Sequence, residues 1–214
     1  MAKSQLGDIP ENFILHDQLM ENVKSYTGTH IGIERKPCSQ DVTETRLKTA
    51  RRTSYALMGA GMHGYNGINP EIIMKFWNTY VRPRLVFGLD SIVLTKKDIH
   101  ELSHYHKSVL KVMQNLPERT ADAAVYTLFG ELPLESFIHS QILVKLGGIL
   151  RNGGIEKEIY IRQLLVKNNY SNSWFIFAKN ILDFYELPSI FDLNIENIPS
   201  KLVWKKHIKE KLEK

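Results

Sequence analysis

The spacing of hydrophobic positions changes near residue 40. Before it, two short β-prone runs, residues 23–27 and 29–33, are separated by Gly28, which predicts a hairpin or two edge strands. From Asp41 onward, apolar residues recur at helical spacing, and Gly, Pro and Asn residues interrupt the periodic stretches. The pattern therefore predicts a mainly α chain, a multi-helix bundle with a small β-hairpin-like segment at its N-terminus.

The periodic stretches also predict where the helices lie. Helices are expected at residues 41–62, 70–81, 96–114, 119–129, 134–150, 155–167, 173–187 and 201–214. The second has a clear start, because Asn69 can cap a helix whose first position is Pro70. Pro83 is expected to kink or stop it, since proline lacks the amide hydrogen that a helix uses.

Most aromatic side chains stand at spacings typical of core faces. Core positions are expected for Phe76, Trp77, Tyr80, Trp174, Phe175, Phe177, Phe184 and Tyr185. Trp204 lies beside Lys205 and Lys206, and the sequence leaves its setting open.

The helix expected at residues 41–62 carries the clearest functional pattern. Its core stripe is expected to hold Val42, Ala50, Thr53, Ala56, Leu57 and Ala60. The opposite face holds Lys48, Arg51, Arg52 and Tyr55. Cations can replace the counterions of a sugar-phosphate backbone, and an aromatic ring can stack on a base or ribose. This face therefore predicts a nucleic-acid contact.

Further basic residues occur elsewhere in the chain. Arg82 and Arg84 add two cations at the end of the next helix, and the segment 201–214 is rich in lysine. The alternative for every such run is a solvated helix face, and that is the plainer interpretation of residues 201–214.

Residues 100–104 read His-Glu-Leu-Ser-His and match H-E-x-x-H, in which two histidines hold zinc and the glutamate is a base. The core stripe of the surrounding helix is expected to be Ile99, Leu102, His106, Val109, Leu110 and Met113. His100 and His104 instead share a face with Lys107 and Lys111, whose ammonium groups oppose a bound Zn²⁺. We therefore favour two solvated histidines and keep a zinc metallopeptidase as an alternative.

Residues 59–64 match G-x-G-x-x-G. A dinucleotide-binding loop follows a strand, whereas here a long helix comes first. We expect a helix C-terminus and turn, because glycine adopts positive φ at little cost.

Composition limits the class of protein. The 214 residues carry 28 Lys and Arg against 23 Asp and Glu, and this net charge of +5 permits a polyanionic partner. One cysteine excludes an internal disulfide framework and a Cys-rich zinc module. No apolar run approaches the roughly 18–20 residues that span a bilayer, and the N-terminus lacks the apolar core of a signal peptide. We expect an intracellular protein of the nucleus or cytoplasm, neither secreted nor in a membrane.

A series of segments between about residues 23 and 210 carries a family resemblance. The segments are His30–Ile33, Thr49–Gly64, Asn66–Pro70, Tyr80–Leu89, Leu116–Thr120, Leu128–Pro133, Trp174–Phe175, Leu187–Pro188 and Lys201–Lys206. In this order they resemble reverse transcriptases of non-LTR (LINE-type) retrotransposons, from the end of the palm through the thumb and the downstream helical linker. None of them is a catalytic signature.

The resemblance implies an organisation and a role. Residues 1–40 would be the end of a palm-like segment with short strands, 41–115 a thumb-like helical bundle, and 116–214 a helical linker region. A thumb of this family grips the template–primer duplex through its backbone, with Lys48, Arg51, Arg52 and Tyr55 at the matching positions.

The catalytic centre of that family is not found in this sequence. A polymerase of this type holds two Mg²⁺ ions with palm carboxylates that include an Asp-Asp pair, and the chain has no Asp-Asp dipeptide. We therefore expect a non-catalytic reverse transcriptase fragment without catalytic residues, metal or cofactor, whose protein partners would be the missing palm and fingers. An inert remnant of a decayed retroelement reading frame is a further alternative.

Overall fold

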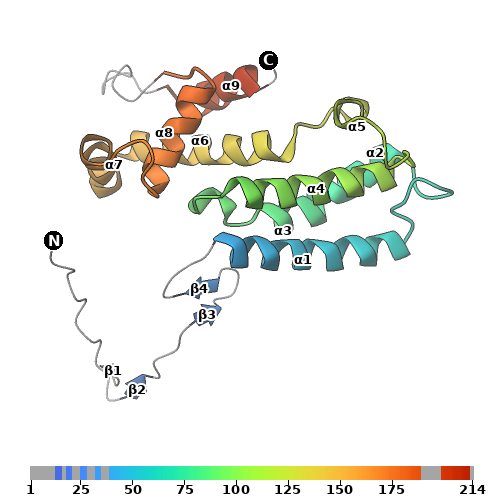
Figure 1. The fold of residues 1–214 in the computed structure, drawn as a ribbon, viewed down its shortest axis with the longest axis horizontal. Coiled ribbons are helices and arrows are strands. Elements are labelled where there is room, and N and C mark those ends of the chain that lie inside the picture. The colour runs from blue at the N-terminus through green and yellow to red at the C-terminus, as the bar shows by residue number, and fades with distance from the viewer. Residues whose placement is uncertain are drawn as a thin grey trace. The chain divides into compact units, whose positions relative to one another are not determined.

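The chain is described by a computed structural model that covers residues 39–188 and 199–212, together with the backbone of short strands within residues 13–34. It divides into two compact units, Met1–Cys38 and Ser39–Lys214. The described residues are mainly helical, which confirms the class predicted from the apolar spacing (Figure 1).

The first unit contains two antiparallel strand pairs. Strand β1 (Phe13–Leu15) pairs with β2 (Gln18–Met20), and β3 (Ser25–Thr27) pairs with β4 (Gly32–Glu34). Residues 28–31, which connect β3 to β4, lie outside the described residues. The hairpin expected at residues 23–33 therefore stays a prediction.

The second unit is built from helices. They are α1 (Ser39–Gly59), α2 (Pro70–Phe76), α3 (Arg82–Val86), α4 (Lys96–Met113), α5 (Asp122–Phe129), α6 (Leu134–Asn152), α7 (Gly154–Val166), α8 (Trp174–Phe184) and α9 (Lys201–Leu212). A π-helical turn, η1 (Trp77–Val81), joins α2 to α3, and a 3-10 turn, η2 (Leu89–Ser91), follows. Every predicted helix is present, although the one expected from residue 119 begins at Asp122.

The segment from Asn69 to Val86 shows how the chain deals with a proline inside a helix. The Asn69 side chain accepts a hydrogen bond from the Glu71 amide at 2.8 Å, so the predicted cap is confirmed. Pro83 does not stop the helical path. Its ring would crowd the carbonyl group four residues earlier, and the wider π-helical turn at Trp77–Val81 allows the chain to continue as α3.

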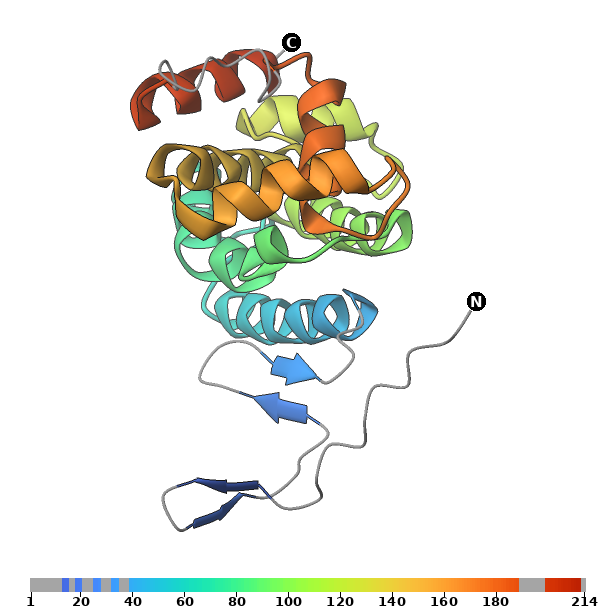
Figure 2. The ribbon, with the colours of Figure 1, turned by 90° about the vertical axis from the view of Figure 1, so that its left-hand side faces the viewer.

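Helices α1, α4 and α6 run side by side through the second unit (Figure 1), and α1 and α9 lie at its opposite ends in both views (Figure 2). Helix α4 packs against α5 and α6, which come after residue 115 in the sequence. The division of the chain into residues 41–115 and 116–214 stays a prediction. None of the described helices is both long enough and apolar enough to cross a membrane.

The aromatic side chains divide between core and surface. Trp77 is fully buried, as expected, but Phe76, Tyr80 and Phe184 are exposed, so their predicted core positions are wrong. The Phe76 and Tyr80 rings stack on each other, with centroids 6.1 Å apart, on the exposed side of α2 and η1.

Trp204, which the sequence left open, is a core residue. It is 2% exposed, and its indole Nε1 donates a hydrogen bond to the Leu143 carbonyl at 2.9 Å. The ring lies directly over Gly147 of α6, where a Cβ atom would stand 2.4 Å from the indole nitrogen. The missing side chain at residue 147 thus lets α9 dock on α6.

The buried stripe of α1 differs from the predicted one. The buried residues are Thr43, Leu47, Ala50 and Ser54. Of the predicted stripe, Ala50 is confirmed and Val42 and Leu57 pack partly buried against the core, whereas Ala56 and Ala60 are exposed. The helix is rotated toward α4, where the Ser54 hydroxyl and the Tyr105 hydroxyl form a buried hydrogen bond of 2.6 Å. Apolar spacing misses Thr43 and Ser54 because these hydroxyl residues are buried in spite of their polarity.

Candidate nucleic-acid interface

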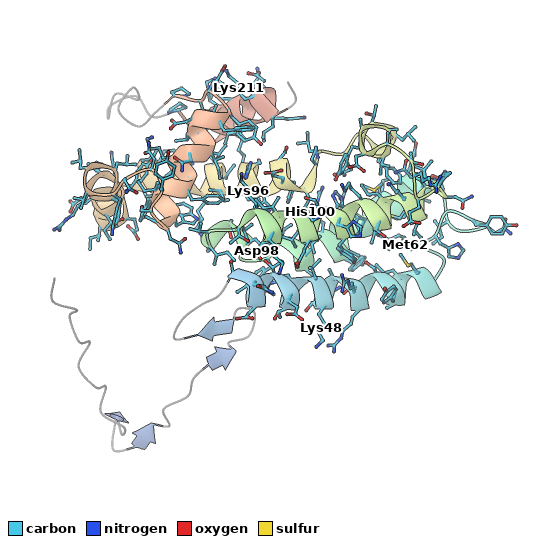
Figure 3. The ribbon with its side chains drawn as sticks, in the orientation of Figure 1. Lys48, Met62, Lys96, Asp98, His100 and Lys211 are labelled. Atoms are coloured by element: carbon cyan, nitrogen blue, oxygen red, sulfur yellow. The ribbon has the colours of Figure 1, made fainter. Side chains whose placement is uncertain are left out.

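The α1 cationic face consists of Lys48, Arg51, Arg52 and Tyr55, and all four side chains are exposed. Figure 3 shows Lys48 pointing away from α4. Within the described part of the chain, neither Lys48 nor Arg52 forms an ion pair with a carboxylate. Tyr55 is 68% exposed, which leaves its ring open for stacking. The structure therefore brings these four predicted residues together on one surface.

Arg51 occupies the edge of this face next to α4. Its guanidinium carbon lies 5.8 Å from the centre of the Tyr105 ring, a cation–π contact. Burial raises the pKa of Tyr105, and its hydroxyl is held by Ser54. Tyr105 is thus a fixed, neutral platform that positions Arg51, and no local motif in the sequence pointed to it.

Charge is segregated along α1. Asp41 and Glu44 lie on the first turns, and the basic residues follow from Arg46 onward. An acidic residue in the first turn favours the helix dipole, but that effect falls off within a turn, and the last turn of α1 holds no basic residue. Lys48, Arg51 and Arg52 stand in the middle of the helix, so stabilisation of the dipole does not account for them.

Arg82 and Arg84, which the sequence grouped, point to different places. The Arg84 guanidinium donates to the Tyr80 carbonyl at 3.2 Å and to the Thr53 hydroxyl at 3.4 Å, so it lies exposed beside α1. Arg84 therefore places a further exposed cation beside α1.

Arg82 instead forms an internal ion pair. Its Nη1 lies 3.0 Å from Glu131 Oε2, its guanidinium lies over the Phe137 ring at 4.5 Å, and its side chain is only 21% exposed. Asn78 donates to the second oxygen of the same carboxylate at 3.1 Å. Because its charge is balanced within the protein, Arg82 does not belong to the surface formed by α1 and Arg84.

The H-E-x-x-H residues lie on the surface of α4. His100 and His104 are exposed, and Glu101 lies 3.9 Å from Lys97. Among the residues that the structure describes, no group of three or more His, Cys, Asp or Glu side chains could hold a metal ion. The predicted core stripe of α4 is confirmed, with Ile99 only partly buried.

His106 is the buried histidine of that stripe. Its ring stacks on Trp77 at a centroid distance of 5.3 Å, and neither ring nitrogen has a hydrogen-bond partner among the described residues. Burial, with a smaller contribution from Arg82, lowers the pKa of His106 to about 3, so the imidazole is neutral at pH 7.

The glycine-rich segment forms a turn, as predicted. Helix α1 ends at Gly59, and Gly61 has a φ of +101°, a conformation that favours glycine. The Gly61 carbonyl accepts the amide hydrogen of Ile68 at 3.0 Å and so closes the loop. The match to G-x-G-x-x-G is therefore the end of a helix.

No protein family model, curated protein or solved structure matches this chain.

Proposed function

We propose that the chain binds nucleic acid through its sugar-phosphate backbone and that the α1 cationic face, extended by Arg84, makes the contact. The observation that carries the proposal is the clustering of Lys48, Arg51, Arg52 and Arg84, none of which forms an ion pair with a carboxylate in the described part of the chain. Tyr55 adds an exposed ring to the same surface.

The physical basis is the release of counterions. A cationic side chain that neutralises a phosphate releases a condensed counterion, so that the logarithm of the binding constant falls by about 0.9 per phosphate contact for each unit of log salt. Contacts to phosphate position a protein on a duplex but carry no sequence information. The binding should therefore depend strongly on salt and weakly on sequence.

The resemblance to the thumb of non-LTR reverse transcriptases suggests which nucleic acid to test. It makes the ligand a template–primer duplex, and the chain a non-catalytic fragment that grips this duplex without copying it. That identification is a proposal supported by the order of the segments in the sequence alone.

A duplex-binding experiment tests the proposal. We would follow the fluorescence anisotropy of a labelled RNA–DNA hybrid across a salt series for the full chain, for Lys48→Gln/Arg52→Gln, and for Lys201→Gln/Lys205→Gln. The last variant removes the same two charges from exposed positions of α9 and so controls for net charge. All four substitutions replace exposed side chains, so both variants should fold.

We expect the α1 variant to reduce the slope of log Kd against log salt by about 1.8, the loss of two phosphate contacts, and the α9 variant to reduce it much less. Binding that is flat with salt, or equal losses in the two variants, would refute the α1 interface. No binding by a well-folded wild-type chain would favour the inert remnant instead.

A further inference from the structure

The loop between α1 and α2, residues 60–69, is closed at its base by hydrogen bonds (Figure 1). The Gly61 carbonyl accepts the amide hydrogen of Ile68 at 3.0 Å, and the Gly64 amide donates to the Val112 carbonyl of α4 at 3.1 Å. These bonds hold the base of the loop together and attach it to the C-terminal end of α4.

The tip of the same loop, residues 65–67, makes no backbone hydrogen bond to any described residue. Tyr65, Asn66 and Gly67 are all exposed, and the Asn66 side chain has no hydrogen-bond partner in the described part of the chain. The main chain can therefore rotate about Asn66 without breaking a hydrogen bond, and the Gly67 amide nitrogen is free to react.

The geometry of the tip explains why an asparagine is followed there by a glycine. Asn66 has a φ of +50°, in the left-handed region that asparagine enters more readily than most residues. At residue 67, a Cβ atom would overlap the His63 carbonyl oxygen and would stand 2.7 Å from the Gly61 carbonyl oxygen. The fold therefore requires a residue without a side chain directly after the exposed asparagine.

An asparagine followed by glycine can lose its side-chain amide in an intramolecular reaction. The main-chain nitrogen of the glycine gives its proton to a base in the solvent and attacks the asparagine Cγ. A new C–N bond forms, the old Cγ–N bond breaks, and the leaving amide takes a proton from water and departs as ammonia. Water then opens the cyclic imide at either carbonyl, which yields aspartate or isoaspartate. A hydrogen bond from the attacking amide opposes the first step, because it must be broken.

The chain has a second Asn-Gly pair, Asn152–Gly153, at the C-terminal end of α6. Asn152 is exposed too, but it lies in the last turn of the helix, and the Gly153 amide donates to the Ile149 carbonyl at 3.3 Å. Attack at this pair requires that the hydrogen bond break and that the turn unwind. The two pairs thus have the same two residues, and the fold leaves the attacking nitrogen free in only the first of them.

We propose that Asn66 is a site of spontaneous deamidation, and that in the folded chain it converts at least about tenfold faster than Asn152, the factor that one backbone hydrogen bond supplies. The product carries a carboxylate in place of a neutral amide. Isoaspartate also lengthens the main chain by one carbon atom, directly before Gly67, where the loop has no room for an added atom. The inference is independent of nucleic-acid binding.

The test is incubation of the full chain at pH 8, with the same chain unfolded in guanidinium chloride as the control. Timed samples are digested at mildly acidic pH, and mass spectrometry follows the conversion of the two Asn-Gly peptides. In the folded chain, the Asn66 peptide should convert at least about tenfold faster than the Asn152 peptide. In guanidinium chloride the two rates should become similar, because the Gly153 amide then has no partner.

Two variants refine the experiment. Asn66→Gln should stop the conversion at residue 66, and Asn152→Gln should leave the rate at Asn66 unchanged. Asn66→Asp carries the charge of the product on a main chain of normal length, so the isoaspartyl form, purified by chromatography, should have a lower Tm than this variant. Equal Tm values would overturn the claim that isoaspartate does not fit the loop.

The deamidation proposal is overturned if Asn152 converts as fast as Asn66 in the folded chain, or if only the unfolded chain converts at Asn66. It is also overturned if the same difference in rate persists in guanidinium chloride. The preceding residues, Tyr65 and Arg151, would then decide the rates, and the fold would not.

Discussion

Gly147 offers the sharpest test of how the helical unit is packed. An alanine there would place its Cβ 2.4 Å from Nε1 and 2.5 Å from Cδ1 of Trp204, far closer than real Cβ contacts. The indole cannot rotate away without losing its hydrogen bond to Leu143 and exposing a side chain that is almost fully buried. Overpacking of this kind reduces the free energy of unfolding by about 1–3 kcal/mol. The higher helix propensity of alanine offsets up to about 1 kcal/mol of this loss in the free energy of unfolding.

Gly148 is a matched control in the same helix, since a Cβ there meets no atom within 4 Å. Gly148→Ala should therefore stabilise the chain by up to about 1 kcal/mol, whereas Gly147→Ala should destabilise it. Because the propensity gain is common to both positions, the two variants should differ by the overpacking cost, about 1–3 kcal/mol in urea unfolding followed by circular dichroism, or roughly 2–12 °C in Tm. If Gly147→Ala is as stable as Gly148→Ala, Trp204 does not pack over this position and the docking of α9 is wrong. Trp204→Leu in the Gly147→Ala background should recover part of the loss.

Two further predictions concern buried titratable groups. The pKa of His106 is about 3 in the folded chain, against about 6.5 for an unperturbed histidine, so the unfolded chain binds a proton that the folded chain does not. The free energy of unfolding therefore falls as pH drops below about 6.5. His106→Phe should keep the stacking on Trp77, and between pH 7 and pH 5 its free energy of unfolding should fall by up to about 2 kcal/mol less than that of the wild type, measured by urea unfolding. Burial alone would raise the pKa of Asp98, but hydrogen bonds from Thr95 and Ser39 outweigh burial and lower this pKa. The ionised Asp98 therefore stabilises the fold above its unfolded-state pKa. This stabilisation is lost as pH falls through the folded-state pKa. Asp98→Asn should lower the free energy of unfolding by about 2–3 kcal/mol at pH 7, and this free energy should then depend less on pH below pH 4. An unchanged midpoint of urea unfolding would contradict this role of Asp98.

Local features of the chain could be predicted where a single helix face decides the outcome. The stripe of α4 runs through Leu102, Val109 and Met113 at regular spacing, and these apolar residues are buried as expected. The cap at Asn69 and the turn at Gly61 were equally readable, because each depends on the chemistry of a few neighbouring residues.

Features that depend on distant partners could not be read from the spacing. The stripe of α1 was misplaced because Ser54 is buried through a hydrogen bond to Tyr105, and these two residues are 51 positions apart. From the sequence, Arg82 is expected to be a surface cation, but in the structure it forms an ion pair with Glu131, which lies 49 positions further along the chain. In both cases the local sequence gives no sign of the partner that decides where the side chain points.

The same long-range contacts bear on the proposed binding surface of α1. Helix α1 is joined to α4 by two polar links, Ser39 to Asp98 at 2.8 Å and Ser54 to Tyr105 at 2.6 Å. Because these links join residues well separated along each helix, they hold α1 and α4 in a fixed relative orientation. The α1 cationic face is therefore presented on a rigid frame. A duplex that binds this face pays little entropy for ordering α1, so preorganisation strengthens whatever affinity the cations supply.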